Sequence, residues 1–103
     1  NELGILHNSI PNEFSIYQNY PNPFNPTTKI QYNLPEKEFV NIDIYNLRGN
    51  KVRSLLNTSI DAGYRSIIWD ATNDLGQSVS AGMYIYTIQA GSFRQTKKMI
   101  LLK

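Results

Sequence analysis

The residues that could carry out chemistry are few and far apart. His7 is the only histidine, and the chain contains no cysteine. A hydrolytic triad needs a base that a third group orients, and a transition-metal site needs several His, Cys or carboxylate ligands at close spacing. A single histidine near the N-terminus supplies neither arrangement. The sequence therefore predicts no catalytic residue, no metal-ligand set and no cofactor, and it indicates a protein that is not an enzyme.

One stretch, from Asp70 to Gly76, is rich in the oxygen ligands that Ca²⁺ prefers. The spacing of its two aspartates does not match an EF-hand loop. Aspartate and asparagine also favour turns, because their side chains hydrogen-bond the local backbone. A calcium loop and an ordinary turn both remain open at this point.

The tyrosines allow a binding interpretation. The alternation of side chains places one set inward, where their rings would fill a core: Tyr32, Tyr84 and Tyr86. It places another set outward: Tyr17, Tyr45 and Tyr64. The outward set could form a sugar-binding platform, as in the carbohydrate-binding modules of secreted enzymes. A structural spacer domain is a further alternative.

Length and composition limit what these residues can belong to. The chain has 103 residues, of which 41% are hydrophobic and 17% charged, with a formal net charge of +2. These values predict one folded domain and argue against a nucleic-acid partner, because no strongly basic patch is present. The longest apolar run, Met99–Leu102, is far short of the ~20 residues that span a bilayer, so no membrane span is expected.

From Phe14 onward, short segments of alternating apolar and polar residues are separated by turn residues. The expected strands are Phe14–Asn19, Thr28–Leu34, Val40–Tyr45, Lys51–Leu56, Tyr64–Asp70, Met83–Ala90 and Phe93–Leu102. Their spacing of about 8–12 residues is typical of an all-β, immunoglobulin-like β-sandwich of about seven antiparallel strands. A small barrel is the alternative fold. Trp69, the only tryptophan, is expected at the centre of the core.

Several local details follow from the same alternation. Asn33 is expected to face water, and Arg65 is expected to share the inward face of its strand with Trp69. Thr58–Gly63 is predicted to be a turn and Ala71–Gly82 a long polar loop. The register of Met99–Leu102 stays open, because four consecutive apolar residues fit either phase.

The N-terminal part of the chain differs from the rest. Asn1–Glu13 has no sustained period, so we expect residues 1–13 to be a linker or tail from a preceding domain and residues 14–103 to form the sandwich. Because the chain begins at Asn1 rather than at methionine, we expect it to be the last part of a longer protein that ends at Lys103.

Three stretches, in this order, form a familiar set. The first is Tyr20–Ile30 (YPNPFNPTTKI), and the middle one is Ala62-Gly63 followed by Trp69-Asp70 and Asn73–Gly76 (NDLG). The last is Ser80–Tyr86 (SAGMYIY), which leads to the basic end Lys97–Lys103 (KKMILLK). Together they resemble the type A C-terminal sorting domain of the type IX secretion system. They are also similar to the immunoglobulin-like domain of the flagellar hook-capping protein. The resemblance covers roughly Phe14–Lys103.

This resemblance implies a non-catalytic sorting signal attached to a larger cargo protein of a Gram-negative bacterium. In that family the cargo reaches the periplasm, and the outer-membrane type IX translocon recognises the domain and delivers the cargo to the surface or the extracellular space. A sortase-like peptidase commonly removes the domain during surface attachment. We expect the chain to be a monomer that has the translocon and the peptidase as partners.

The family motifs fall on named positions of this sequence. The expected recognition residues are Pro21, Asn22, Pro23, Gly82, Tyr84, Lys98 and Lys103. The sequence departs from the family pattern at Arg65, where relatives often have histidine, and at Ala71, where glycine usually follows Trp-Asp.

Two physical expectations accompany these motifs. The missing Cβ of Gly82 is expected to let the backbone pass close to the Tyr84 ring. Phe93–Leu102 is expected to be an edge or near-edge strand, which a receptor could read by adding a strand of its own. Our hypothesis from the sequence is that the translocon reads this last strand and its lysines.

Overall fold

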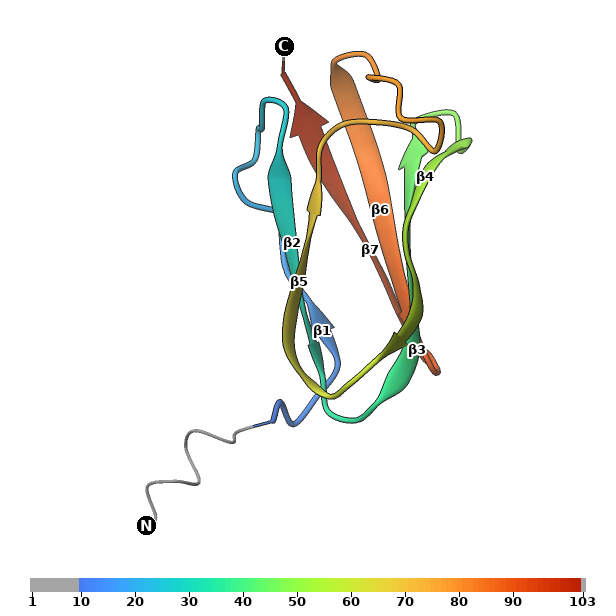
Figure 1. Ribbon diagram of the computed structural model, residues 1–103. Coiled ribbons are helices and arrows are strands. Elements are labelled where there is room, and N and C mark those ends of the chain that lie inside the picture. Colours follow the sequence, from blue (N-terminus) through green and yellow to red (C-terminus); the bar gives the residue numbers. More distant parts are fainter. Residues whose placement is uncertain (1–9, 103) are drawn as a thin grey trace.

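The computed structural model describes residues 10–102, and every regular element within them is a β-strand. The strands are β1 (Ser15–Ile16), β2 (Thr28–Leu34), β3 (Glu38–Asn46), β4 (Lys51–Ile60), β5 (Gly63–Trp69), β6 (Gly82–Ala90) and β7 (Phe93–Leu101). They form a three-stranded sheet in the order β1-β2-β5 and a four-stranded sheet in the order β4-β3-β6-β7 (Figure 1). All pairings are antiparallel. The prediction of a seven-stranded immunoglobulin-like sandwich is confirmed.

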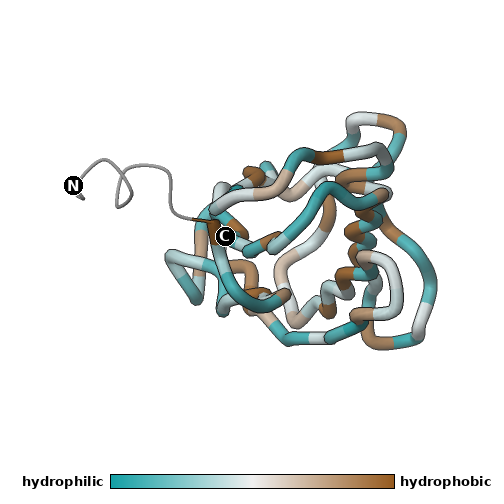
Figure 2. Tube along the Cα trace, turned by 90° about the horizontal axis from the view of Figure 1, so that it is seen from below, coloured by the Kyte–Doolittle hydropathy of each residue, from teal (hydrophilic) through white to brown (hydrophobic). Residues whose placement is uncertain are grey.

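The core lies between the two sheets because alternate residues of each strand point inward. Ile30 and Leu34 of β2, Ile42 of β3 and Ile88 of β6 are completely buried. A view close to the strand direction shows two layers in which hydrophobic and hydrophilic residues alternate along the chain (Figure 2). Trp69 lies at the centre of this core, as predicted, and is 0% exposed.

Three local expectations were wrong. β4 continues to Ile60, where a turn was expected, because it pairs with β3 as far as Glu38. Arg65 is exposed rather than inward, and its guanidinium folds back to donate to the backbone carbonyls of residues 61 and 62. Asn33 is buried rather than water-facing, and its side-chain amide donates to the Tyr17 hydroxyl.

The register of the last strand, which the sequence left open, is defined by its pairing with β6. Met99 lies opposite Tyr84, and Leu101 lies opposite Gly82. Met99 and Leu101 therefore point into the core, where they are almost completely buried, whereas Ile100 and Leu102 point outward and are exposed. The described part of the chain has no helix that could cross a membrane.

The loop between β5 and β6 lies against the outer edge of β4. The backbone N–H of Asp74 donates to the carbonyl of Val52, and the carboxylate of Asp74 accepts from the N–H of Ser54. The Arg53 guanidinium donates to Thr72 in the same loop. This long polar loop was predicted, and these contacts show that it covers part of a sheet edge that would otherwise be exposed.

Candidate recognition site

Residues 18–24, which we call the clasp, lie along the outer edge of β7. The backbone of Phe24 accepts from the N–H of Leu102 (2.8 Å) and donates to the carbonyl of Ile100 (3.0 Å). The side-chain carbonyl of Asn22 accepts from the N–H of Ile100 (2.9 Å). The side-chain amide of Gln18 donates to the carbonyl of Lys98 (2.7 Å). The clasp therefore satisfies the outward-facing backbone groups from the Lys98 carbonyl to the Leu102 N–H.

A buried polar network fixes the position of the clasp. Asn19 is 2% exposed, and its side-chain amide donates to the Thr28 hydroxyl (2.9 Å) and to the Pro21 carbonyl (3.2 Å). The backbone N–H of Asn19 donates to the Tyr86 hydroxyl, which in turn donates to the carbonyl of Tyr17 (both 2.8 Å). Because each of these polar groups has a partner, the network can be buried without a large desolvation cost.

An aromatic cluster anchors the other end of the clasp. The Phe24 side chain is 2% exposed, and its ring lies 5.8 Å from the ring of Trp69. The Trp69 ring meets Tyr84 edge to face at 5.4 Å, and its indole N–H donates to the Thr72 carbonyl. The clasp is thus attached to the centre of the core and belongs to the folded domain.

These contacts correct one expectation about the last strand. β7 is an edge strand, as predicted. However, the clasp occupies the outer edge of its C-terminal half, so a receptor strand cannot pair there while the domain is folded.

The structure brings most of the expected recognition residues together at the C-terminal end of β7 (Figure 1). Pro21, Asn22 and Pro23 are exposed on the clasp beside Ile100. Gly82 lies across from Leu101, and Lys98 is exposed on β7. Lys103 lies outside the described residues.

Tyr84 also lies at this end, but it is buried. Its ring packs against Trp69, and its hydroxyl donates to the carbonyl of Ser80 (2.6 Å). Such a side chain cannot touch a partner of the folded domain. Its place in the motif is explained by packing, because it holds the start of β6 and the preceding loop against the core.

Comparison with known proteins identifies the family. The sequence profile of the family described as "Secretion system C-terminal sorting domain" matches residues 18–102. The chain belongs to this family. It is a C-terminal sorting-signal domain of type IX secretion, and its family indicates a non-catalytic role and a destination at the cell surface or outside the cell.

Solved structures with the same fold include proteins of that secretion system. Dimeric latent PorU from Porphyromonas gingivalis matches at 21% identity and a TM-score of 0.69, over 92% of this chain and 10% of its own. PorZ, an essential surface component of the type IX system of the same bacterium, matches at 14% identity and a TM-score of 0.56, over 87% of this chain and 11% of its own. FlgD from P. aeruginosa matches at 21% identity and a TM-score of 0.57, over 89% of this chain and 74% of its own. No curated protein matches the sequence.

The sorting domain does not gather its aspartates into a calcium site. The carboxylate of Asp70 accepts from the Thr72 hydroxyl, whereas that of Asp74 accepts from the Ser54 backbone and lies 3.8 Å from the Arg53 guanidinium. Within residues 10–102, no three His, Cys, Asp or Glu side chains come together in a way that could hold a metal ion. The Asp70 contact is a local one within the turn, whereas the Asp74 contacts hold the loop against β4.

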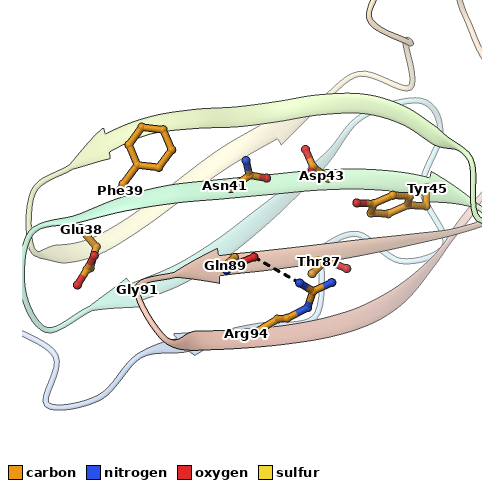
Figure 3. Close-up of a pocket in the computed structure, with 9 residues that line it drawn as sticks. All are labelled: Glu38, Phe39, Asn41, Asp43, Tyr45, Thr87, Gln89, Gly91 and Arg94. Carbon is orange, nitrogen blue, oxygen red and sulfur yellow. Dashed lines mark hydrogen bonds between the residues drawn. The ribbon is translucent and has the colours of Figure 1, made fainter.

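The outward tyrosines of the sorting domain do not form one platform. Tyr17 and Tyr64 line a hollow of about 320 Å³ on the outer face of the three-stranded sheet. Tyr45 lines a different hollow, of about 480 Å³, on the outer face of the four-stranded sheet (Figure 3). That second hollow is mostly polar, with Asp43 and Arg94 among its side chains. The family match and this separation do not favour the sugar-binding interpretation.

The sorting domain needs glycine at position 82 because of the backbone conformation there. The expectation that the missing Cβ lets the backbone pass close to the Tyr84 ring was wrong. The φ of Gly82 is +148°, and a Cβ added there would meet no atom within 4 Å. Ala71 shows the same kind of constraint, because its φ is +65° at the position where family members usually have glycine. An alanine in this conformation is strained.

We predict that Gly82→Ala lowers the free energy of unfolding by about 1–3 kcal/mol, the usual cost of forcing a side chain into such a conformation. Gly76→Ala is a suitable comparison, because Gly76 also has a positive φ (+81°) and open space around it but lies in the exposed β5–β6 loop. Urea unfolding of both variants measures the effect. Equal stability of Gly82→Ala and the natural chain would contradict the backbone explanation.

Proposed function

We propose that this sorting domain directs an upstream cargo protein from the periplasm through the outer-membrane translocon of the type IX system. The translocon recognises the C-terminal end of the sandwich, where the exposed part of the clasp (Pro21–Pro23) lies beside β7 and Lys98. Gly82 and Tyr84 act by shaping this end, and Lys103, which lies outside the described residues, takes part in recognition. The observation that carries the proposal is the convergence of these separate sequence motifs at one end of the fold, through the clasp contacts with Ile100 and Leu102.

We also propose a role for each of the two parts of the chain. Residues 14–103 form the sorting domain, and residues 1–13 link it to the cargo. A sortase-like peptidase cuts within this linker when the cargo reaches the surface. The domain acts as a monomer in this process. Ile10, at the start of the described residues, is 52% exposed, which supports access of a peptidase to the linker.

A reporter fusion tests recognition at Lys98. In this experiment the natural chain is fused to the C-terminus of a secreted reporter protein, and the fusion is expressed in a bacterium that has a type IX system. We expect Lys98→Glu to leave the reporter in the periplasm. Lys98 is exposed, so its replacement removes a cation from the C-terminal end of the sandwich without changing the core. Cell fractionation and surface labelling measure the distribution.

Lys29→Glu is the matched control. Lys29 is also exposed, it lies on the three-stranded sheet, and its replacement changes the net charge by the same amount. Surface delivery of Lys29→Glu together with retention of Lys98→Glu supports the proposal. Normal delivery of both variants contradicts the role of Lys98. Deleting Lys98–Lys103 is a less specific test, because it also removes the buried Met99 and Leu101.

A further inference from the structure

The clasp covers only part of the outer edge of β7. Its last contact toward the start of the strand is the bond from Gln18 to the Lys98 carbonyl. At the beginning of the strand, Phe93 stacks on Phe14, with their ring centroids 5.5 Å apart. Between these two points, residues 94–96 are exposed. The stretch 94–98, which we call the open edge, therefore lies between the clasp and this aromatic contact.

Within the part of the chain that the structure describes, the backbone of the open edge has hydrogen-bonding groups without partners. In an antiparallel strand, alternate residues direct both backbone groups to the same side. Ile100 directs its N–H and carbonyl outward to the clasp, so Lys98, Thr96 and Arg94 direct theirs outward as well. No hydrogen bond within residues 10–102 reaches the backbone of Thr96 or Arg94 on this side. These are the groups that pair when a strand is added to a sheet.

The side chains of the open edge are cationic on both faces of the sheet. Arg94 and Lys98 lie on the outer face, and Lys97, opposite Tyr86, lies on the inner face. None of these three side chains forms an ion pair with a carboxylate in the part of the chain that the structure describes. Opposite charges on directly paired strands are stabilising, and like charges are destabilising. The charge of the open edge therefore favours an acidic strand.

A second copy of the domain does not fit this edge. Antiparallel pairing of two copies centred on Thr96 would place Lys98 of each copy opposite Arg94 of the other. Cations on an edge strand are a common means of preventing such self-association. We therefore take the occupant of the open edge to be a strand of another protein.

We propose that the open edge of β7 binds an extended acidic strand of the translocon by β-sheet addition. This inference rests on the proposed function, for which it supplies the chemistry of the partner. Backbone pairing centred on Thr96 provides the hydrogen bonds, and the acidic side chains of the partner strand face Arg94 and Lys98. The clasp restricts the pairing to this stretch and so fixes its register.

A peptide experiment on the purified chain tests the chemistry without the secretion system. The probe is a capped six-residue peptide of alternating Thr and Glu, and the comparison is a peptide of alternating Thr and Lys. We expect only the acidic peptide to shift the amide resonances of residues 94–98 and to slow hydrogen exchange at the Thr96 N–H. Equal binding of both peptides, or binding of the acidic peptide elsewhere, would overturn the inference.

A proline at position 96 separates edge pairing from general attraction between charges. The Thr96 N–H points outward, so Thr96→Pro leaves the pairing with β6 intact but removes one donor from the open edge. We expect it to weaken binding of the acidic peptide at least about fivefold, the equivalent of one backbone hydrogen bond. Thr96→Val is the matched control, because it also loses the hydroxyl contact with Thr87 but keeps the N–H. Equal binding by both variants would count against β-sheet addition.

The same two variants in the reporter fusion connect the edge to secretion. We expect Thr96→Pro to lower surface delivery at least about fivefold relative to Thr96→Val, with both proteins folded by circular dichroism. If the natural chain delivers the reporter and Thr96→Pro does so equally well, the edge inference fails while the proposed function stands. If the natural chain delivers nothing, the proposed function fails, and with it the assignment of the partner strand to the translocon.

Discussion

Replacing Phe24 by alanine is expected to lower the free energy of unfolding by about 3–5 kcal/mol, the range measured when a buried aromatic ring is removed from a core. Phe24 is 2% exposed and packs against Trp69, so its removal leaves a cavity next to the largest side chain of the core. The effect extends to the last strand, because the backbone of Phe24 pairs with Ile100 and Leu102.

Urea unfolding measures the loss of stability, and amide hydrogen exchange measures the release of the clasp. In Phe24→Ala we expect faster exchange at Leu102, whose N–H donates to the Phe24 carbonyl. Phe24→Leu retains much of the buried volume and should be clearly more stable than Phe24→Ala. If Phe24→Ala lowers the free energy of unfolding by no more than about 0.5 kcal/mol, the range of ordinary surface substitutions, Phe24 does not anchor the clasp.

Alkaline pH is expected to destabilise the domain through Tyr86. Burial raises the pKa of Tyr86 to about 12, against a smaller opposing effect of the hydrogen bond from Asn19. Burial also raises the pKa of Tyr32, which the nearby Arg65 partly offsets. An unfolded tyrosine ionises near pH 10, so above that pH the unfolded chain loses protons that the folded chain keeps. The stabilising effect of the raised Tyr86 pKa is fully present below pH 10 and is lost as the pH rises from 10 to about 12. Over this range the free energy of unfolding falls by up to about 1.4 kcal/mol per pH unit.

Tyr86→Phe tests this account by two measurements. At pH 8 it should cost about 1–3 kcal/mol, because the buried N–H of Asn19 and the carbonyl of Tyr17 lose their hydroxyl partner. Between pH 10 and 12 its stability should fall less steeply than that of the natural chain. Tyr64→Phe is the control for removal of a tyrosine hydroxyl, since Tyr64 is 64% exposed and its replacement should cost little stability at pH 8. Identical slopes for the natural chain and Tyr86→Phe would exclude Tyr86 as the cause.

The parts of the fold that the sequence predicted are those governed by strict alternation. The predicted bounds of Thr28–Leu34 agree with β2, because Ile30, Tyr32 and Leu34 alternate with polar residues and a proline follows. The wrong details have a different origin. Arg65 occupies an inward position by alternation, but β5 is an edge strand on which a long side chain can turn out to solvent. The end of β4 was missed because Asn57, Thr58 and Ser59 carry polar side chains on an edge strand.

Sequence motifs identified the residues that we assign to recognition, but they did not predict that the fold brings these residues together. The sequence identified Pro21–Pro23 and Lys98 as separate motifs, but it gave no reason for them to be neighbours. Asn19 and Phe24, which fix the clasp, were not identified. Phe24 had a signal in the sequence, because an isolated apolar ring between prolines is expected to bury itself. Asn19 had none, since a buried asparagine is recognised only from the partners that three-dimensional folding brings to it.

The path of the chain also determines how this domain can be combined with other proteins. The first described residues, Ile10–Glu13, lie at the opposite end of the sandwich from Leu102 (Figure 1). A passenger fused ahead of residue 10 therefore joins the far pole of the domain, whatever its size or shape. We therefore expect unrelated passenger proteins to be attached there without disturbing the clasp contact of Leu102.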